Sequence, residues 1–198
     1  HKPVACGDWD GVSADDGRRL RAAVGDGQDP TSVCPWEFPE PASPHLAAAA
    51  AGVTLTTAKL DAGLARVRDG DHDLLVEGAG GLLAPLTSDR QTFADLLPQW
   101  QLGALLITRP NLGTLNHTAL TVRAAQAAGI RVIGVVITAT SVVADSLAIR
   151  SAPAELAAIT GLPILAEVPF QPEAGQKVVS MELARAVLSA FFASDSNN

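Results

Sequence analysis

Short, continuous apolar runs alternate along the chain with longer stretches that carry apolar residues at helical spacing. The runs are typical of strands buried on both faces, and they occupy residues 74–76, 102–108, 131–138 and 164–167. The helical stretches occupy residues 13–25, 45–51, 54–69, 92–97, 114–128, 153–159 and 181–192. Strands that alternate with helices predict an α/β fold, in which a mostly parallel sheet carries helices on both faces.

Local signals set several of these boundaries. Ser13 is a candidate N-cap, and Asp15 and Asp16 fall in the first turn of its helix, where the helix dipole favours acidic residues. Four prolines make residues 33–45 an ordered loop rather than a helix. Residues 1–7 are interpreted as the end of a strand.

Length and composition exclude several classes of protein. A chain of 198 residues without a repeat or linker predicts one domain over residues 1–198, with a frayed tail at 194–198. Apolar residues make up 47% and charged residues 18%, which supports a sizeable core. The net charge of −7 argues against a nucleic-acid surface, and no apolar run reaches the roughly 18 residues of a membrane span.

Cysteine usage and the first residue complete this picture. Two cysteines indicate neither a disulfide scaffold nor a zinc site, and no signal peptide is visible, so we expect a cytoplasmic protein. The first residue is His1 rather than Met, and we therefore expect the native start to lie further upstream.

Candidate chemistry centres on Glu77, which follows the apolar run at 74–76. Gly78, Ala79, Gly80 and Gly81 come directly after it. Ligands of open parallel sheets bind at the carboxyl ends of strands, where a carboxylate can hold Mg²⁺ and small residues let the backbone approach phosphates. The alternative is a glycine turn beside a solvated carboxylate.

Three further positions carry candidate charges or donors. Lys2 lies at a strand end, from which its amine can reach a phosphate or a substrate anion, although a lysine near a terminus is often only solvated. Asp16, with Asp15 as the alternative, is either a capping acid or a second metal-side carboxylate. Gly113 precedes a helix whose first N–H groups form an anion site.

Several motifs in order give the chain a specific resemblance. They lie at residues 2–7, 38–45, 76–81, 112–117, 134–136 and 167–169, and read KPVACG, FPEPASPH, VEGAGG, LGTLNH, GVV and EVP. Together they resemble dethiobiotin synthetase, a ligase family of the P-loop NTPase superfamily. The resemblance runs in register from residue 1 to about residue 170.

The resemblance implies a reaction and its participants. The family uses ATP and CO₂ to close a cyclic urea on 7,8-diaminononanoate in biotin biosynthesis, as a homodimer with Mg²⁺. A substrate amine captures CO₂ as a carbamate, which is phosphorylated to a mixed anhydride. The second amine then closes the ring and expels phosphate.

The resemblance also implies roles for matching residues. Lys2 is implied as the catalytic lysine at the carbamate and the γ-phosphate, and Asp16 and Glu77 as metal-side carboxylates. The implied nucleotide-binding residues are Asp16, Glu77, Gly78, Ala79, Gly80, Thr138 and Pro169. The implied substrate-binding residues are Lys2, Cys6, Gly80, Gly113, Thr114, Leu115 and Asn116, the last four across the dimer interface. Cys6 replaces a hydroxyl residue of the family, and a thiol is the weaker hydrogen-bond partner.

Two departures from the family pattern change the expectation. No Gly-Lys-Ser/Thr occurs in the sequence, so we expect a strand, P-loop and helix of roughly 30–35 residues to be missing from it. If the sequence is complete, we expect weak or no ATP turnover and poor solubility. Thr138, Ala139 and Thr140 stand where many members place an adenine-reading Asn, and we hypothesise that CTP and GTP are accepted beside ATP.

Two other classes remain open at this point. One is a non-catalytic relative that serves as a regulatory or dimerisation module, which the absent P-loop fits. The other is a different amide-forming or partitioning ATPase of the same superfamily. Substrate-dependent turnover separates the ligase from the first, and substrate choice separates it from the second.

Overall fold

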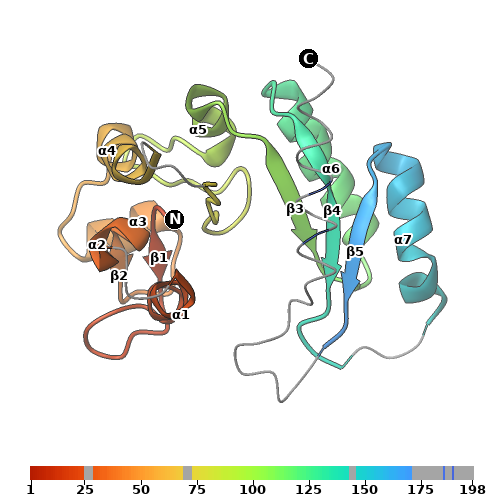
Figure 1. Ribbon diagram of the computed structural model, residues 1–198, viewed down its shortest axis with the longest axis horizontal. Coiled ribbons are helices and arrows are strands. Elements are labelled where there is room, and N and C mark those ends of the chain that lie inside the picture. The colour runs from red at the N-terminus through yellow and green to blue at the C-terminus, as the bar shows by residue number, and fades with distance from the viewer. Residues whose placement is uncertain (25–28, 69–72, 143–145, 171–184, 186–188, 190–198) are drawn as a thin grey trace. The chain divides into compact units, whose positions relative to one another are not determined.

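The computed structural model describes residues 1–24, 29–68, 73–142 and 146–170, together with Arg185 and Ser189. The chain divides into two compact units, residues 1–99 and residues 100–198. Every strand pair in the described residues is parallel, and helices connect the strands, so the α/β fold is confirmed (Figure 1). Within each unit, the strands bring the candidate residues to defined positions.

The first unit is built around a short parallel pair, β1 (Ala5–Cys6) and β2 (Glu37–Phe38). Backbone bonds extend this pair, because the Lys2 N–H donates to the Val33 carbonyl at 2.8 Å and the Gly7 N–H donates to the Phe38 carbonyl at 3.0 Å. Residues 2–7 therefore run alongside residues 33–38, and the strand end that the sequence predicts is assigned at Ala5–Cys6. β2 lies inside the proline-rich stretch at 33–45, where the sequence predicted only a loop.

The described part of this unit also contains five helices, of which the last ends at Trp100. They are α1 (Asp15–Val24), α2 (Pro30–Val33), α3 (Pro44–Ala50), α4 (Thr57–Arg68) and α5 (Phe93–Trp100). α3 contacts both strands, and α2 contacts α1 and α4. Because α1 begins at Asp15, Ala14 rather than the predicted Ser13 precedes the helix. The Asp10 carboxylate accepts hydrogen bonds from the N–H groups of Val12 and Ser13, both at 2.8 Å, and closes the loop before it.

The segment at 74–76 corrects one prediction. No strand is assigned there, although the main chain runs beside His1 in a parallel manner: the His1 nitrogen donates to the Leu75 carbonyl at 2.7 Å, and the Glu77 N–H donates to the His1 carbonyl at 2.8 Å. Leu75 is 79% exposed, whereas Leu74 and Val76 are partly buried. The prediction that this segment is buried on both faces is therefore wrong. Successive side chains of an extended segment point to opposite sides, and only one side is packed here.

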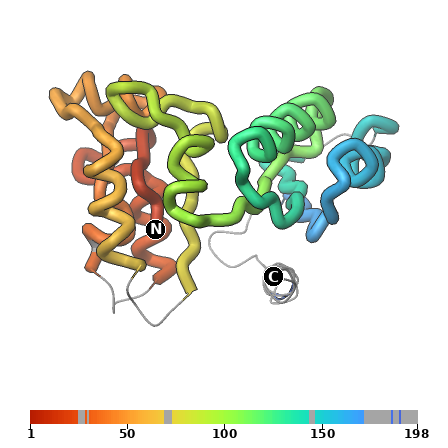
Figure 2. Tube along the Cα trace, turned by 90° about the horizontal axis from the view of Figure 1, so that it is seen from above, coloured from red at the N-terminus to blue at the C-terminus, as the bar shows by residue number. Residues whose placement is uncertain are grey.

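The second unit contains a three-stranded parallel sheet in the order β3 (Ala104–Thr108), β4 (Val132–Thr138) and β5 (Ile164–Val168). α6 (Thr114–Ala127) and α7 (Leu147–Thr160) pack against each other and against the strands (Figure 2). Val135 and Ile137 of β4 and Leu156 of α7 form the buried core of this unit. Of the three strands described in this unit, β4 alone has a continuous buried run, at residues 134–137. Ile107 of β3 is 63% exposed, and Glu167 of β5 is also exposed, so the predicted burial is wrong for these two strands.

Two helix predictions in this unit have different outcomes. α7 begins at Leu147 rather than at residue 153, because the Ser146 side chain caps it by accepting from the Ile149 N–H at 3.4 Å. Pro153, where the sequence predicts the helix to begin, lies inside it. The predicted closing helix at 181–192 lies outside the described residues except for Arg185 and Ser189, which are both helical.

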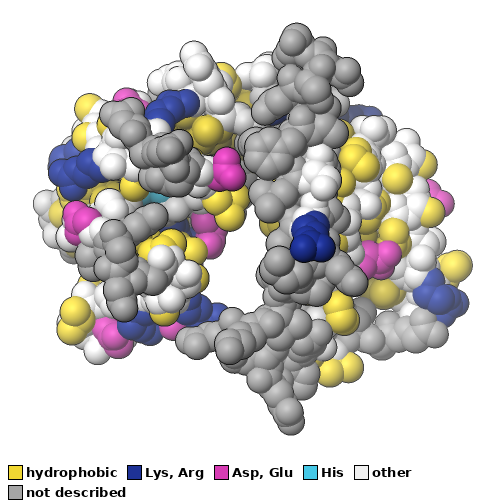
Figure 3. Space-filling model, in the orientation of Figure 1, with side chains coloured by type: hydrophobic (Ala, Val, Ile, Leu, Met, Phe, Trp, Pro, Cys, Tyr) yellow, Lys and Arg dark blue, Asp and Glu magenta, His cyan; other side chains and the backbone are white. Residues whose placement is uncertain are grey.

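Surface apolar side chains are dispersed among polar and charged ones on the face seen in Figure 3. Among the described residues, the most exposed large apolar side chains are those of Leu112, Val142 and Val12, at 91%, 83% and 82%. No helix within the described ranges is long and apolar enough to cross a membrane.

Candidate active site

A buried lysine joins two carboxylates in the first unit. The Lys2 side chain is 5% exposed, and its Nζ lies 2.7 Å from Glu77 Oε1 and 2.9 Å from Asp16 Oδ2. The two acidic side chains are 52% (Asp16) and 51% (Glu77) exposed. The structure therefore brings together the three charged residues that the sequence singles out, with the ammonium inside and the carboxylates open to solvent.

Each of the three charges is placed by a different segment. Lys2 is fixed by the parallel bonding of residues 2–7 to residues 33–38. Asp16 lies in the first turn of α1, where the exposed N–H groups of the helix favour a negative charge. Glu77 is held by its main-chain bond to His1, which precedes Lys2.

The charge state of Lys2 follows from this arrangement. Burial alone would lower the pKa of Lys2, but hydrogen bonds and charge attraction from Glu77 and Asp16 outweigh it, and the pKa is raised above its ordinary value. Lys2 is therefore protonated throughout the physiological range, and it contributes a fixed positive charge between the two acids.

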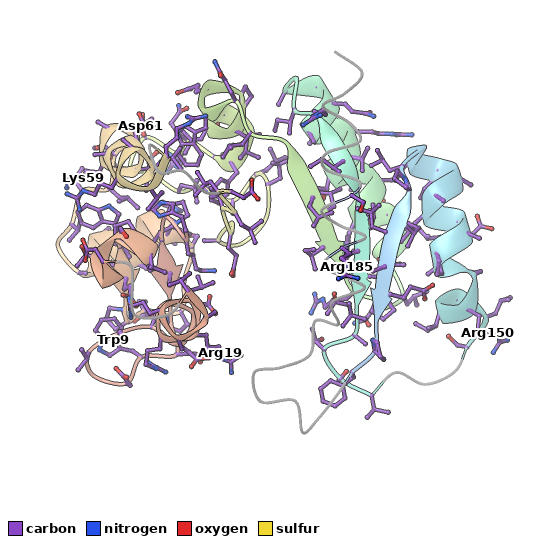
Figure 4. The ribbon with its side chains drawn as sticks, viewed as in Figure 1. Trp9, Arg19, Lys59, Asp61, Arg150 and Arg185 are labelled. Carbon is purple, nitrogen blue, oxygen red and sulfur yellow. The ribbon has the colours of Figure 1, made fainter. Side chains whose placement is uncertain are left out.

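The alternative acid, Asp15, points elsewhere. Its carboxylate lies 3.0 Å from Arg18 Nη2 and 2.7 Å from Arg19 Nε. Arg19 projects outward from α1 (Figure 4). Asp16, rather than Asp15, is thus the acid of this pair that contacts Lys2.

The donor set of this cluster fits a hard divalent cation. Mg²⁺ is commonly held by one or two carboxylates, with water and phosphate oxygens completing its shell. Asp16 and Glu77 converge on one cationic atom and are half exposed, which leaves room for such partners. No group of three or more His, Cys, Asp or Glu side chains that could hold a metal occurs within the described ranges.

The residues after Glu77 form a tight turn. Ala79 is buried, and Gly80 has φ +73°, a left-handed conformation that glycine adopts without strain. A Cβ at Gly80 would lie 3.0 Å from the Ala84 Cβ, and one at Gly78 would lie 3.4 Å from the Phe93 ring. The left-handed backbone and the close Ala84 contact favour glycine at position 80, whereas a Cβ at position 78 would make an ordinary contact.

Cys6 ends β1 and carries a neutral thiol. Burial raises the pKa of the Cys6 thiol to about 11, although the nearby charge of Lys2 lowers it in part. The side chain at this position adds no negative charge close to Lys2 at neutral pH.

The remaining candidate residues gather within the second unit, at the carboxyl ends of its strands. Thr138 pairs with Val168 in the register of β4 and β5, and the Ala139 N–H donates to the Val168 carbonyl at 2.9 Å. Thr138 and Pro169 therefore lie at neighbouring strand ends. Gly113, with φ +97°, leads from the end of β3 into α6, whose first turn contains Thr114, Leu115 and Asn116.

Known proteins place the chain in a family. A family model described as an AAA domain matches residues 1–178. The ATP-dependent dethiobiotin synthetase BioD of Anaeromyxobacter dehalogenans (strain 2CP-C) is 36% identical over 176 residues, covering 89% of this chain and 78% of that protein. The protein of the same name from Anaeromyxobacter sp. (strain K) is 36% identical over 181 residues, covering 91% and 79%. The chain belongs to the dethiobiotin synthetase family.

A further relative comes from another organism. The Serratia marcescens protein, which is also named ATP-dependent dethiobiotin synthetase BioD, is 39% identical over 137 residues, covering 68% of this chain and 60% of its own length. The parallel α/β architecture of the chain is consistent with the P-loop NTPase-like fold expected for a dethiobiotin synthetase.

One feature of this synthetase chain was missed by sequence reasoning. The Thr108 hydroxyl, at the end of β3, lies 2.9 Å from the Thr114 hydroxyl and accepts a hydrogen bond from Thr118 at 3.0 Å. Thr114 and Thr118 are buried. These three hydroxyls tie the start of α6 to the strand end, and the i, i+4 spacing of the two helical threonines was the only signal in the sequence.

Replacing Thr108 by Val tests this hydroxyl cluster. The change keeps the side-chain shape but removes both hydrogen bonds, so we expect the free energy of unfolding to fall by about 1 to 2 kcal/mol. Thr121→Val is the matched control, because its hydroxyl donates to the His117 carbonyl on an exposed part of α6. This change should alter stability by less than about 0.5 kcal/mol. Equal losses in a urea titration would contradict a special role for the cluster.

The thiol of Cys6 gives a second test. In a Cys34→Ala variant, alkylation reports on Cys6 alone. Because its pKa rises from 9.0 to about 11, the thiolate fraction of Cys6 at pH 8 should be about a hundredfold lower in the folded protein than in the unfolded chain. We expect the pH profile of the native alkylation rate to be displaced upward by about 2 pH units from that in denaturant. Superimposable profiles would show that slow alkylation reflects access rather than ionisation.

Proposed function

We propose that this chain catalyses the ATP-dependent closure of a cyclic urea on 7,8-diaminononanoate with CO₂, giving dethiobiotin in biotin biosynthesis. Family membership supports the reaction class, and the contact of buried Lys2 with Asp16 and Glu77 supports the chemistry. A fixed cation beside two carboxylates is suited to phosphoryl transfer, which depends on positioning and charge neutralisation.

The proposed reaction has three bond-forming steps. One substrate amine attacks CO₂, and its nitrogen loses a proton as the carbamate forms. A carbamate oxygen then attacks the γ-phosphorus of ATP, and the bond from that phosphorus to the ADP oxygen breaks. The second amine attacks the carbamate carbon of this mixed anhydride, the ring closes with loss of a proton, and inorganic phosphate leaves.

Lys2 has the central role in this proposal. Its ammonium, held protonated by its two partners, attracts the carbamate oxygen and the γ-phosphate and stabilises the charge that develops between them. Asp16 and Glu77 are proposed to hold Mg²⁺, which when bound neutralises phosphate charge. The turn at 78–80 is proposed to lie against the nucleotide, with Gly80 also against the substrate.

The diamine is proposed to be recognised by separate groups. Cys6 is proposed to contact its reacting end as a neutral thiol, so this side chain adds no negative charge where the carbamate forms. The first N–H groups of α6, at residues 113–116, are proposed to bind the distal carboxylate from the other protomer of a homodimer. Thr138 and Pro169 are assigned to the nucleotide base.

The decisive test is phosphate release from MgATP by the folded protein, with and without 7,8-diaminononanoate and bicarbonate. We expect release that depends on the diamine, and Lys2→Met should lower kcat by about a hundredfold or more because it removes the fixed charge. Lys59→Met is the control, since Lys59 in the same unit donates to the Thr54 carbonyl and lies over the Trp36 ring, and it should retain activity. Folded protein that releases no phosphate would instead indicate a binding module.

The identity of residue 138 tests nucleotide choice. A threonine hydroxyl cannot make the paired contact with a base edge that an Asn amide makes, so we expect kcat/KM values for ATP, CTP and GTP within about tenfold of one another. Thr138→Asn should raise the preference for ATP by about tenfold, as one paired contact is worth roughly 1–3 kcal/mol of discrimination. A wild-type rate for ATP far above the other two would exclude relaxed selectivity.

A further inference from the structure

A second carboxylate, that of Glu37, lies against the first turns of α1. Its Oε2 accepts a hydrogen bond from the Ala14 N–H at 2.9 Å, and its Oε1 accepts one from Arg21 Nη1 at 2.6 Å. Arg21 Nη2 lies 3.3 Å from Oε2, so the pair is bidentate. The side chains are 14% (Glu37) and 22% (Arg21) exposed, and this ion pair is much less solvated than Asp16 and Glu77.

Gly17 makes this close contact possible. A Cβ built at Gly17 would overlap the Glu37 carboxylate and lie 3.1 Å from Arg21 Nη2. Glycine inside a helix is unfavourable because it loses more backbone freedom than other residues. The helix therefore accepts an unfavourable residue where its backbone approaches the Glu37 carboxylate.

Glu37 is connected to both halves of the lysine cluster. It belongs to β2, where it pairs with Ala5 of β1, three residues after Lys2. It also holds α1 on both sides of Asp16, through Ala14 before it and Arg21 after it. Through these contacts, one side chain fixes the turn that carries Asp16 against the strand segment that carries Lys2.

We propose that Glu37 is a positioning residue that acts through Asp16, with Arg21 as the cation that keeps its charge compensated. This inference rests on the proposed role of Asp16 at the magnesium-bound nucleotide. Residues that orient a ligand of a metal commonly change metal affinity or activity by 10- to 100-fold when replaced. Arg21 is required to compensate the charge of Glu37. Without it, the Glu37 carboxylate would be a poorly solvated, unpaired anion next to the turn that carries Asp16.

Glu37→Gln keeps a carbonyl acceptor for the Ala14 N–H but removes the charge pair with Arg21. We expect kcat/KM for MgATP to fall about tenfold and the Mg²⁺ concentration for half-maximal rate to rise, whereas KM for the diamine changes less than about twofold. Arg21→Gln should show the same pattern, and Arg21→Lys should restore part of the loss. Arg19→Gln is the matched control, because it removes an exposed arginine of the same helix that pairs with Asp15, and its rates should match the wild type.

A double-mutant cycle identifies the route of action. In an Asp16→Asn background, Glu37→Gln should lower the residual rate by less than about twofold, since the group that it positions is already altered. An equal loss in both backgrounds, or a loss confined to the diamine KM, would overturn the inference.

The same four proteins, namely wild type, both single variants and the double variant, separate this inference from the proposed function. Their urea midpoints should be non-additive if Glu37 and Asp16 are coupled through the α1 turn, whether or not the chain turns over ATP. Additive midpoints would overturn the positioning role. Absence of diamine-dependent phosphate release from the wild type would overturn the proposed function alone.

Discussion

The need to compensate one buried ammonium constrains the organisation of the first unit. An isolated charge taken out of water is costly, and the cost is recovered only where opposite charges and hydrogen bonds meet it with good geometry. Lys2 is almost fully buried, so both Asp16 and Glu77 must reach it. Because these acids belong to segments far apart in the sequence, their contacts with Lys2 also fix a helix and a turn against the strand.

Two consecutive aspartates in α1 illustrate how a helix divides its charges. Successive residues of a helix are rotated by about 100° from one another, so Asp15 and Asp16 face different surroundings. Asp15 meets two arginines of its own helix, whereas Asp16 turns toward Lys2. The sequence leaves open which of the two acids contacts Lys2. Their different positions around the helix decide that it is Asp16.

The sequence predicted the parallel α/β class and the candidate charges, because strand ends and short motifs carry those signals locally. It did not predict β2, whose two residues lie among prolines and form no apolar run. It also overestimated the burial of residue 75, since an apolar run contains no information on whether both sides are covered. The contacts of Glu37 and Thr108 depend on the approach of segments distant in the sequence, which periodicity within one segment cannot reveal.

The pairing of residues 2–7 with residues 33–38 affects how the first unit forms. The two paired segments are about thirty residues apart, and the acid that meets Lys2 from beyond the apolar run is Glu77, 75 residues later. Forming contacts between residues so far apart in the sequence requires closing long loops, which costs chain entropy. Such contacts therefore slow folding relative to local contacts. During synthesis, the charge of Lys2 thus stays without its full set of partners until more than seventy further residues have left the ribosome.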